Sequence, residues 1–368
     1  MYTVTDLAPT AVTGISNAAA INAGGMVVGQ MDTAVGFLWT PNAPNDVNGT
    51  LQQLPTLMPP SAGLPSECFP FSINVSGDIV GKCETIDAGG TTVTRAFLFR
   101  GGVMGDLGTF LPDPANPGFF LGSSEGNSIN DVGQIVGKAD DTGGIEHGFF
   151  LDLSVSPTMR NLFSLVPPIM LPGPADPSVA TAINNSSLVV GTAAAVDAAN
   201  NIVERAFSWD PTTATMTDLG TLVPDPANPG KFLGESSAEA VNNAGQIMGD
   251  SETVPPATGA SIRMATGFGA APVMMAGPST GAASGINDNP AGAEVVGWFQ
   301  SGIGAAGPLT SGLYVSNAAG VVDLNTQLAT PDWTIQKATG INDKGQICGV
   351  GTHATLGPNR AILLTPTP

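Results

Sequence analysis

The residues best able to do chemistry in this sequence are acidic, and they stand in segments rich in turn-forming residues. Asp140, Asp141 and Glu146 lie within one seven-residue span, and comparable segments carry further acids, namely Glu84, Asp87, Asp197, Glu204 and Glu252. Carboxylates at such spacing could bind Ca²⁺ or a basic partner. Two acids brought together from distant segments could also hydrolyse a glycosidic bond. A solvated acidic rim is the third interpretation, and it needs no ligand.

The other chemically active residue types limit the ligands and reactions that the sequence allows. Trp333 lies in the segment before the last copy of a repeat described below, and we select it as the aromatic residue for stacking on a sugar. The chain contains only two histidines, which nearly excludes a His-rich metal site. No nucleophile–base pattern, phosphate-binding loop or zinc-ligand spacing occurs. We therefore expect no cofactor, with Ca²⁺ as the one alternative left open.

Three cysteines are few for a secreted chain, but their positions are informative. If a tight turn pairs Ile73 with Asp78, antiparallel pairing puts Cys68 opposite Cys83, and a cross-strand disulfide can form there. Cys348 stands where other copies of the repeat have Val, so we expect a buried structural thiol.

A ten-residue pattern must position all of these residues. The segment SINDVGQIVG (128–137) recurs as SINVSGDIVG (72–81), AINNSSLVVG (182–191), AVNNAGQIMG (240–249) and GINDKGQICG (340–349). Its Ile/Val-Asn pair occurs seven times at intervals of 45 to 58 residues, with the Asn at positions 22, 74, 130, 184, 242, 287 and 342. Such a period indicates a propeller or solenoid array, and the repeats of β-solenoids are usually shorter.

Each repeat holds four short β-type runs separated by turn residues, which is typical of one propeller blade. The last repeat lacks its fourth run, and the N-terminal segment supplies one, which would remove an exposed sheet edge. We therefore predict an all-β fold, one closed seven-bladed β-propeller over residues 1–368 with four antiparallel strands per blade. The blade units are about 12–57, 68–110, 123–165, 178–222, 235–277, 281–328 and 334–368, the last completed by the N-terminal strand (1–9).

The repeated residues favour structural roles. The Asn of the first turn can hydrogen-bond its own backbone. Small residues one and three positions before each Ile/Val are expected to share the strand face that lines a central channel. An Arg opens the third run where the fourth run carries an Asp, which predicts three structural cross-strand pairs: Arg95–Asp106, Arg205–Asp218 and Arg360–Asp6. In the third repeat His147 replaces the Arg, and Asn161 replaces the Asp.

The composition argues against several partners. The net charge is −19, which disfavours nucleic acid and an anionic membrane surface as partners. No apolar run approaches the ~18 residues of a membrane-spanning helix, and no signal-peptide pattern is present in this chain. An acidic, lysine-poor and turn-rich composition fits an extracellular or cell-surface protein.

The order INxxGxxVG, then (R/H)AF, then DLGTL resembles the HAF-repeat family, the extracellular repeats of bacteria. The resemblance covers nearly the whole chain, is strongest over 72–110 and 128–222, and is weakest over 250–284. Only His147 keeps the His of the family name, and Gly148 follows it in place of Ala. The resemblance implies an extracellular repeat protein and provides no established enzymatic activity to transfer.

Long variable segments join the second strand of each unit to the third, and each unit to the next. In a propeller these segments lie on one loop-rich face, and binding residues are most often on such loops. We predict a non-enzymatic interaction scaffold that binds a glycan or an extracellular protein at this face. Two alternatives stay open, a structural subunit that self-assembles and a propeller glycosidase or lyase with acids at the channel mouth.

Overall fold

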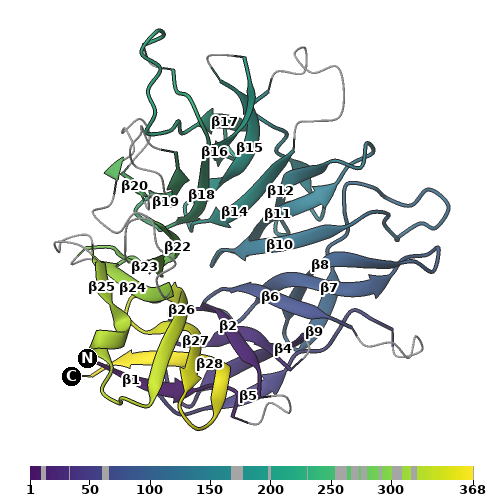
Figure 1. Ribbon diagram of the computed structural model, residues 1–368. Coiled ribbons are helices and arrows are strands. Elements are labelled where there is room, and N and C mark those ends of the chain that lie inside the picture. The colour runs from purple at the N-terminus through teal and green to yellow at the C-terminus, as the bar shows by residue number, and fades with distance from the viewer. Residues whose placement is uncertain are drawn as a thin grey trace. The chain divides into compact units, whose positions relative to one another are not determined.

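The computed structural model describes residues 1–9, 14–32, 34–59, 66–166, 177–197, 200–229, 231–252, 263–266, 273–274, 280–289, 292–300, 309–315 and 321–367. The strands form seven four-stranded antiparallel sheets (Figure 1). The predicted all-β class and the four-stranded units are therefore confirmed. Within the described ranges no helix is long and apolar enough to cross a membrane, and the short 3₁₀ helix η2 (Leu324–Gln327) has four residues.

The chain divides into two compact units. The first comprises Met1–Thr85, Phe97–Gly105 and Ala276–Pro368. It holds three complete sheets: β2 (Ser16–Ile21), β3 (Val27–Met31), β4 (Val35–Pro41) and β5 (Gly49–Gln53); β22 (Thr280–Ile286), β23 (Glu294–Gln300), β24 (Leu309–Val315) and β25 (Val321–Asp323); and β26 (Trp333–Ile341), β27 (Ile347–His353), β28 (Gly357–Pro366) and β1 (Tyr2–Asp6).

The second unit comprises Ile86–Ala96 and Asp106–Met275. Its three sheets are β10 (Ser124–Ile129), β11 (Gln134–Asp140), β12 (Glu146–Asp152) and β13 (Arg160–Asn161); β14 (Ser178–Ile183), β15 (Val189–Val196), β16 (Ile202–Asp210) and β17 (Thr215–Asp218); and β18 (Ser236–Val241), β19 (Gln246–Ser251), β20 (Arg263–Thr266) and β21 (Val273–Met274). The seventh sheet has residues in both units and consists of β6 (Cys68–Ile73), β7 (Ile79–Ile86), β8 (Thr92–Arg100) and β9 (Val103–Asp106).

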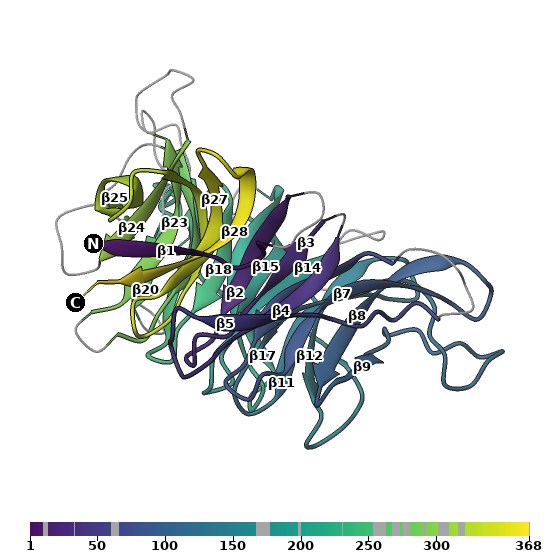
Figure 2. The same cartoon turned by 90° about the horizontal axis from the view of Figure 1, so that it is seen from below.

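The N-terminal strand completes the last sheet, as its sequence position suggested. β1 pairs antiparallel with β28, from Tyr2 opposite Pro366 to Asp6 opposite Ile362. Figures 1 and 2 both show the two chain ends side by side at this pair of strands. The backbone N–H of Leu7 extends the pairing by donating to the carbonyl of Ala361 at 2.9 Å.

A β-bulge interrupts the first strand of every sheet at the same place. In β2, for example, Ala18 pairs with Gly29 and Ala20 pairs with Val28, so Ala19 has no partner of its own. The equivalent bulged residues are Phe71, Asn127, Thr181, Glu239, Ser284 and Thr339. An unpaired residue reverses the alternation of side chains. The prediction that the two small residues share one strand face is therefore wrong.

The bulge also explains the Gly that closes each ten-residue pattern. At Gly137 an added Cβ would overlap the carbonyl oxygen of Glu125 on the first strand. The same overlap with first-strand backbone occurs at Gly29, Gly81, Gly191, Gly249 and Gly349. Only glycine permits this approach of two backbones, so the repeated Gly reports close strand packing.

Phenylalanines at one equivalent position of the third strands lie in the core. Phe37, Phe97, Phe149 and Phe207 are completely buried, and apolar residues of the second strand, such as Val27, pack in the same clusters. Apolar residues alternate with polar ones only in part, because the third strands are buried on both faces. Aromatic rings bury large apolar areas, so their burial contributes to the packing of the sheets.

The repeated Asn joins neighbouring sheets as well as shaping its own turn. In the first unit the Nδ2 of Asn22 donates to the carbonyl of Asn74 at 2.8 Å, and its Oδ1 accepts from the amides of Gly24 and Met26. Equivalent inter-sheet bonds run from Asn287 to Asn342, from Asn342 to Asn22, and in the second unit from Asn130 to Asn184 and from Asn184 to Asn242. The turn role was predicted from the sequence, and the inter-sheet role was not.

Candidate functional site

The arginines of the third strands β8 and β16 are buried, and they hold the loops between sheets. Arg95 is 1% exposed and donates to the carbonyls of Gly122 and Phe120, in the loop that leads to the next sheet. Arg205, also 1% exposed, donates to the carbonyl of Phe232 at 2.9 Å. Burial lowers the pKa of Arg95 and the charge of Asp106 partly offsets this effect.

The predicted Arg–Asp pairs differ from one another. Arg360 binds Asp6 closely, with Nη2 2.6 Å from Oδ2, and Arg95 Nε lies 3.7 Å from Asp106 Oδ2. No ion pair joins Arg205 to Asp218 in the part of the chain that the structure describes, so that predicted pair is wrong.

The register of the third and fourth strands does not account for this difference. Asp218 lies opposite Phe207, two residues beyond Arg205, and Asp6 lies opposite Ile362, two residues beyond Arg360, so the carboxylate is a diagonal neighbour in both pairs. From this position a long Arg side chain can reach the carboxylate, as Arg360 does, or a loop carbonyl, as Arg205 does.

The three acids selected as ligands serve separate structural roles. Asp140 accepts the amide of Ser123 at 2.7 Å, and Asp141 accepts the amides of Gly143 and Ile145 in its own turn. Asp141 Oδ2 also lies 3.3 Å from Nε2 of His147. Glu146 binds Lys138 at 2.9 Å. The described residues contain no group of three His, Cys, Asp or Glu side chains that could hold a metal ion.

Trp333 has a ring neighbour that the sequence did not reveal. It begins β26 opposite His353, and the two rings meet edge to face with centroids 4.8 Å apart. The indole is half-buried and packs against the core cluster of the last sheet. The sequence singled out Trp333 without the cross-strand register that reveals His353 as its neighbour.

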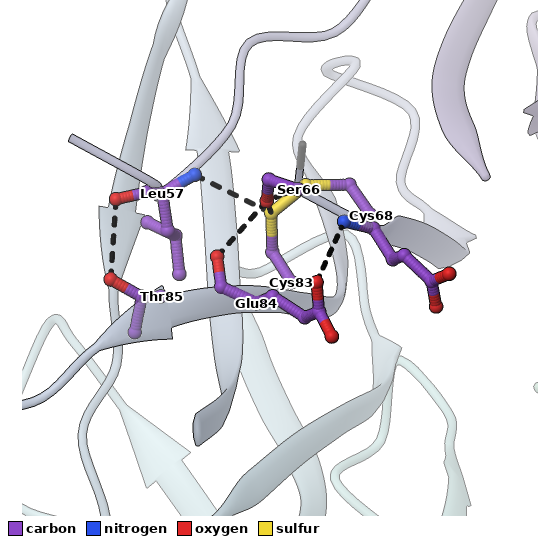
Figure 3. Close-up of a disulfide and its surroundings, with 7 residues drawn as sticks. Leu57, Ser66, Cys68, Cys83, Glu84 and Thr85 are labelled. Atoms are coloured by element: carbon purple, nitrogen blue, oxygen red, sulfur yellow. Dashed lines mark hydrogen bonds between the residues drawn. A yellow bond between two sulfur atoms is a disulfide. The ribbon is translucent and has the colours of Figure 1, made fainter. Parts of the chain in front are cut away.

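Cys68 and Cys83 form a disulfide between β6 and β7, with Cα atoms 4.1 Å apart (Figure 3). The turn pairs Ile73 with Ile79 and not with Asp78, but the bulge at Phe71 shifts the register back by one residue. The two errors cancel, so the cysteines still lie opposite each other. The amide of Leu57 donates to Cys83 Sγ, which ties the preceding segment to the disulfide. Cys348 is a buried free thiol, and burial raises its pKa to about 12.

Two near-identical loops of the second unit stand out on the predicted loop-rich side. We call residues 111–122 (LPDPANPGFFLG) the first twin loop and residues 223–234 (VPDPANPGKFLG) the second twin loop. Residue 230 of the second lies outside the described ranges. They follow β9 and β17, so they lie two sheets apart along the chain.

Internal hydrogen bonds give the first twin loop a fixed conformation. The amide of Asp113 donates to the carbonyl of Phe119 at 2.8 Å, and the Asp113 carboxylate accepts from Ala115 and Asn116. The hydroxyl of Thr109 donates to the carbonyl of Leu121 at 2.7 Å. The side chain of Asn116 lowers the pKa of Asp113, which keeps this carboxylate ionised as an acceptor.

The second twin loop repeats these bonds and differs at one exposed position. Asp225 accepts from Ala227 and Asn228, and its amide donates to the carbonyl of Lys231 at 2.9 Å. Lys231 stands where the first loop has Phe119, which is 53% exposed. The first loop therefore presents an aromatic side chain on a backbone that accepts a charged residue equally well.

No family model and no curated protein matches the chain. Among solved structures, the β-propeller domain of the Trilobed protease from Pyrococcus furiosus, described as having an open velcro topology, is similar with a TM-score of 0.54 and 8% identity. The match covers 96% of each chain. This likeness supports a β-propeller fold and, at this identity, nothing about function.

Two further structures are similar at lower scores. TolB from Acinetobacter baumannii has a TM-score of 0.43 and 9% identity, and the match covers 96% of this chain but only 63% of the TolB chain. A Hadza microbial sialidase has a TM-score of 0.42 and 6% identity over 93% of this chain and 73% of the sialidase. Neither score carries an argument about this protein.

Proposed function

We propose that the chain is a closed seven-bladed β-propeller that acts outside the cytoplasm as a non-enzymatic scaffold and binds a protein through the first twin loop. The seven sheets, the pairing of β1 with β28 and the Asn bonds between sheets support the closed propeller. The Cys68–Cys83 disulfide supports an oxidising compartment, since cytosolic thiols are kept reduced. The resemblance to extracellular HAF repeats points in the same direction.

The proposed binding role depends on exposed apolar side chains of the first twin loop, whose backbone is held by hydrogen bonds. Phe119 and Leu121 are 53% and 39% exposed, while Arg95, Thr109 and Asp113 hold the loop that bears them. Aromatic residues are enriched at the centres of protein interfaces. A loop that is already ordered loses little conformational entropy on binding, so its exposed side chains contribute efficiently to affinity.

The second twin loop provides the matched test. We would place a photo-crosslinking residue at position 119 and expose the protein to the extracellular fraction of its source organism. The crosslinked protein is then purified, and its affinity is measured for the unmodified chain, for Phe119→Lys and for Val155→Lys. The Phe119→Lys change reproduces Lys231 and should lower affinity at least tenfold, about 1.4 kcal/mol. Val155 is exposed in the β12–β13 turn at the other end of its sheet, so Val155→Lys should bind as the unmodified chain does.

Equal affinity of the Phe119→Lys variant would refute the proposed surface. Crosslinking only to a second copy of this chain, together with elution as large assemblies, would favour the structural-subunit alternative, because that alternative predicts self-contacts through the same loops.

A further inference from the structure

The second unit contains a pocket of about 240 Å³ at the tight turns, where the sheet of β14–β17 meets the sheet of β18–β21. We call it the corner pocket. It is lined by the side chains or backbone of Asn184, Ser186, Leu188, Asp210, Asn243 and Gly245. It lies at the strand ends opposite to the twin loops, away from the surface proposed above, because these residues stand in the β14–β15, β16–β17 and β18–β19 turns.

The equivalent corner one sheet earlier is filled by a glutamine. Gln134 Oε1 accepts from Asn130 at 2.8 Å and from the hydroxyl of Ser187 at 2.7 Å. Its Nε2 donates to Asp152 Oδ2 at 2.9 Å. One amide thus joins the turn asparagine to the carboxylate at the end of the third strand, and it bridges to the next sheet.

The corner pocket keeps the asparagine and the carboxylate but lacks the amide between them. Leu188 stands in the place of Gln134, and Gly245 stands in the place of Ser187. The Leu188 side chain has no hydrogen-bonding group, and it packs against an apolar cluster formed by its own sheet and the next one. Within the described residues, Asn184 Nδ2 donates to the carbonyl of Asn242 alone.

The carboxylate of the pocket is held ionised by its own turn. Asp210 accepts from the amide and the hydroxyl of Thr212 at 2.7 and 2.6 Å. These hydrogen bonds lower the pKa of Asp210. The side chain lines the pocket, and no residue that the structure describes takes the place of the inter-strand donor that Gln134 provides to Asp152.

We propose that the corner pocket binds one sugar ring of a neutral glycan. Two neighbouring hydroxyls would replace the missing glutamine amide, one donating to Asp210 and the other accepting from Asn184. Ser186 and Asn243 add polar groups around the ring, and Leu188 offers an apolar surface for its C–H bonds. The volume equals roughly eight waters at ~30 Å³ each, which is room for a single sugar ring.

The test compares two variants that restore the filled corner with one matched control. Saturation-transfer NMR would screen free glucose, galactose, mannose and N-acetylglucosamine against the full chain, and titration would give the affinity of the sugars that bind. Leu188→Gln and Gly245→Ser should each weaken binding at least tenfold. Gly245 has φ +77°, an added Cβ meets nothing within 4 Å, and Ser187 holds φ +66° at the same place, so Gly245→Ser should fold. Asp152→Asn, in the filled corner, should leave sugar binding unchanged.

Failure of all four sugars to bind, or equal binding by the Gly245→Ser variant, would overturn the proposal. If Leu188→Gln unfolds, Gly245→Ser alone decides. The inference does not depend on the first twin loop: Phe119→Lys should retain sugar binding, so the two proposals can fail separately.

Discussion

Replacing Asn22 with Ala removes hydrogen bonds within a turn and between two sheets at once. The side chain is 5% exposed, donates to the carbonyl of Asn74 at 2.8 Å and accepts from Gly24 at 3.0 Å and Met26 at 2.9 Å. Each hydrogen bond contributes about 1 kcal/mol net, and an unsatisfied buried partner costs more than the bond itself. We expect Asn22→Ala to lower the free energy of unfolding by about 3–4 kcal/mol.

That loss converts into a measurable shift of the melting temperature. An unfolding entropy of about 2.1 cal/mol/K per residue gives roughly 0.8 kcal/mol/K for 368 residues. Asn22→Ala should therefore lower Tm by about 4–5 °C in calorimetry. Hydrogen exchange should also quicken at the amides of Gly24 and Met26, because these lose their acceptor.

Asn48→Ala is the matched control for this experiment. The Nδ2 of Asn48 donates to Asp46 at 3.3 Å in an exposed turn of the same sheet. Surface changes of this kind stay within about 0.5 kcal/mol. Equal melting temperatures for the two variants would refute the claim that the repeated Asn stabilises the join between sheets.

Three further outcomes follow from the structure. Unfolding and refolding in reductant should lower the stability by about 3 kcal/mol, as expected for a disulfide that links residues 15 apart, and a Cys68→Ser, Cys83→Ser chain should not respond to reductant. The lowered pKa of Asp113 means that its contribution is complete above the unfolded value near 3.9 and is lost as pH falls through the folded value. The protection of the amides in the first twin loop, relative to their intrinsic exchange rates, should therefore fall below about pH 4, and Asp113→Asn should remove this dependence. Arg95→Met should lower the free energy of unfolding more than Arg205→Met does in chemical denaturation. Arg95 donates to two carbonyls and lies near Asp106, whereas Arg205 donates to one carbonyl and has no ion pair among the described residues. Equal losses of stability would contradict this ranking.

The local structure of each repeat could be predicted from the sequence, and the contacts between repeats could not. The period, the four strands per repeat and the Asn turn depend on residues close in the chain. The bulge did not follow from the pattern, because small residues before each Ile are equally compatible with a regular strand. Its signature was the repeated Gly, which marks close backbone approach, but that interpretation requires knowing which strand lies beside it.

The contacts of the candidate ligand residues could not be predicted for a related reason. Asp141 and Glu146 were selected for their charge, yet nearby partners such as His147 and Lys138 already satisfy them. Trp333 was selected for its aromatic ring, yet this ring makes an edge-to-face contact with its cross-strand neighbour His353. Residue type alone does not distinguish a ligand from a side chain that stabilises a turn, because both roles use the same hydrogen-bonding groups.

A repeat protein contains its own reference for separating these roles. Where a side chain recurs with the same partner, as the turn asparagines do, the fold requires it. Where equivalent positions share a backbone conformation but differ in side chain, the fold does not require one particular side chain. Phe119 against Lys231 and Leu188 against Gln134 are such changes, and both alter a surface without disturbing the strand order around them. Binding specificity in this chain should therefore reside at positions where one repeat differs from the equivalent repeats. Phe119→Lys and Leu188→Gln each introduce the residue of an equivalent repeat, and they test this principle at opposite ends of the sheets.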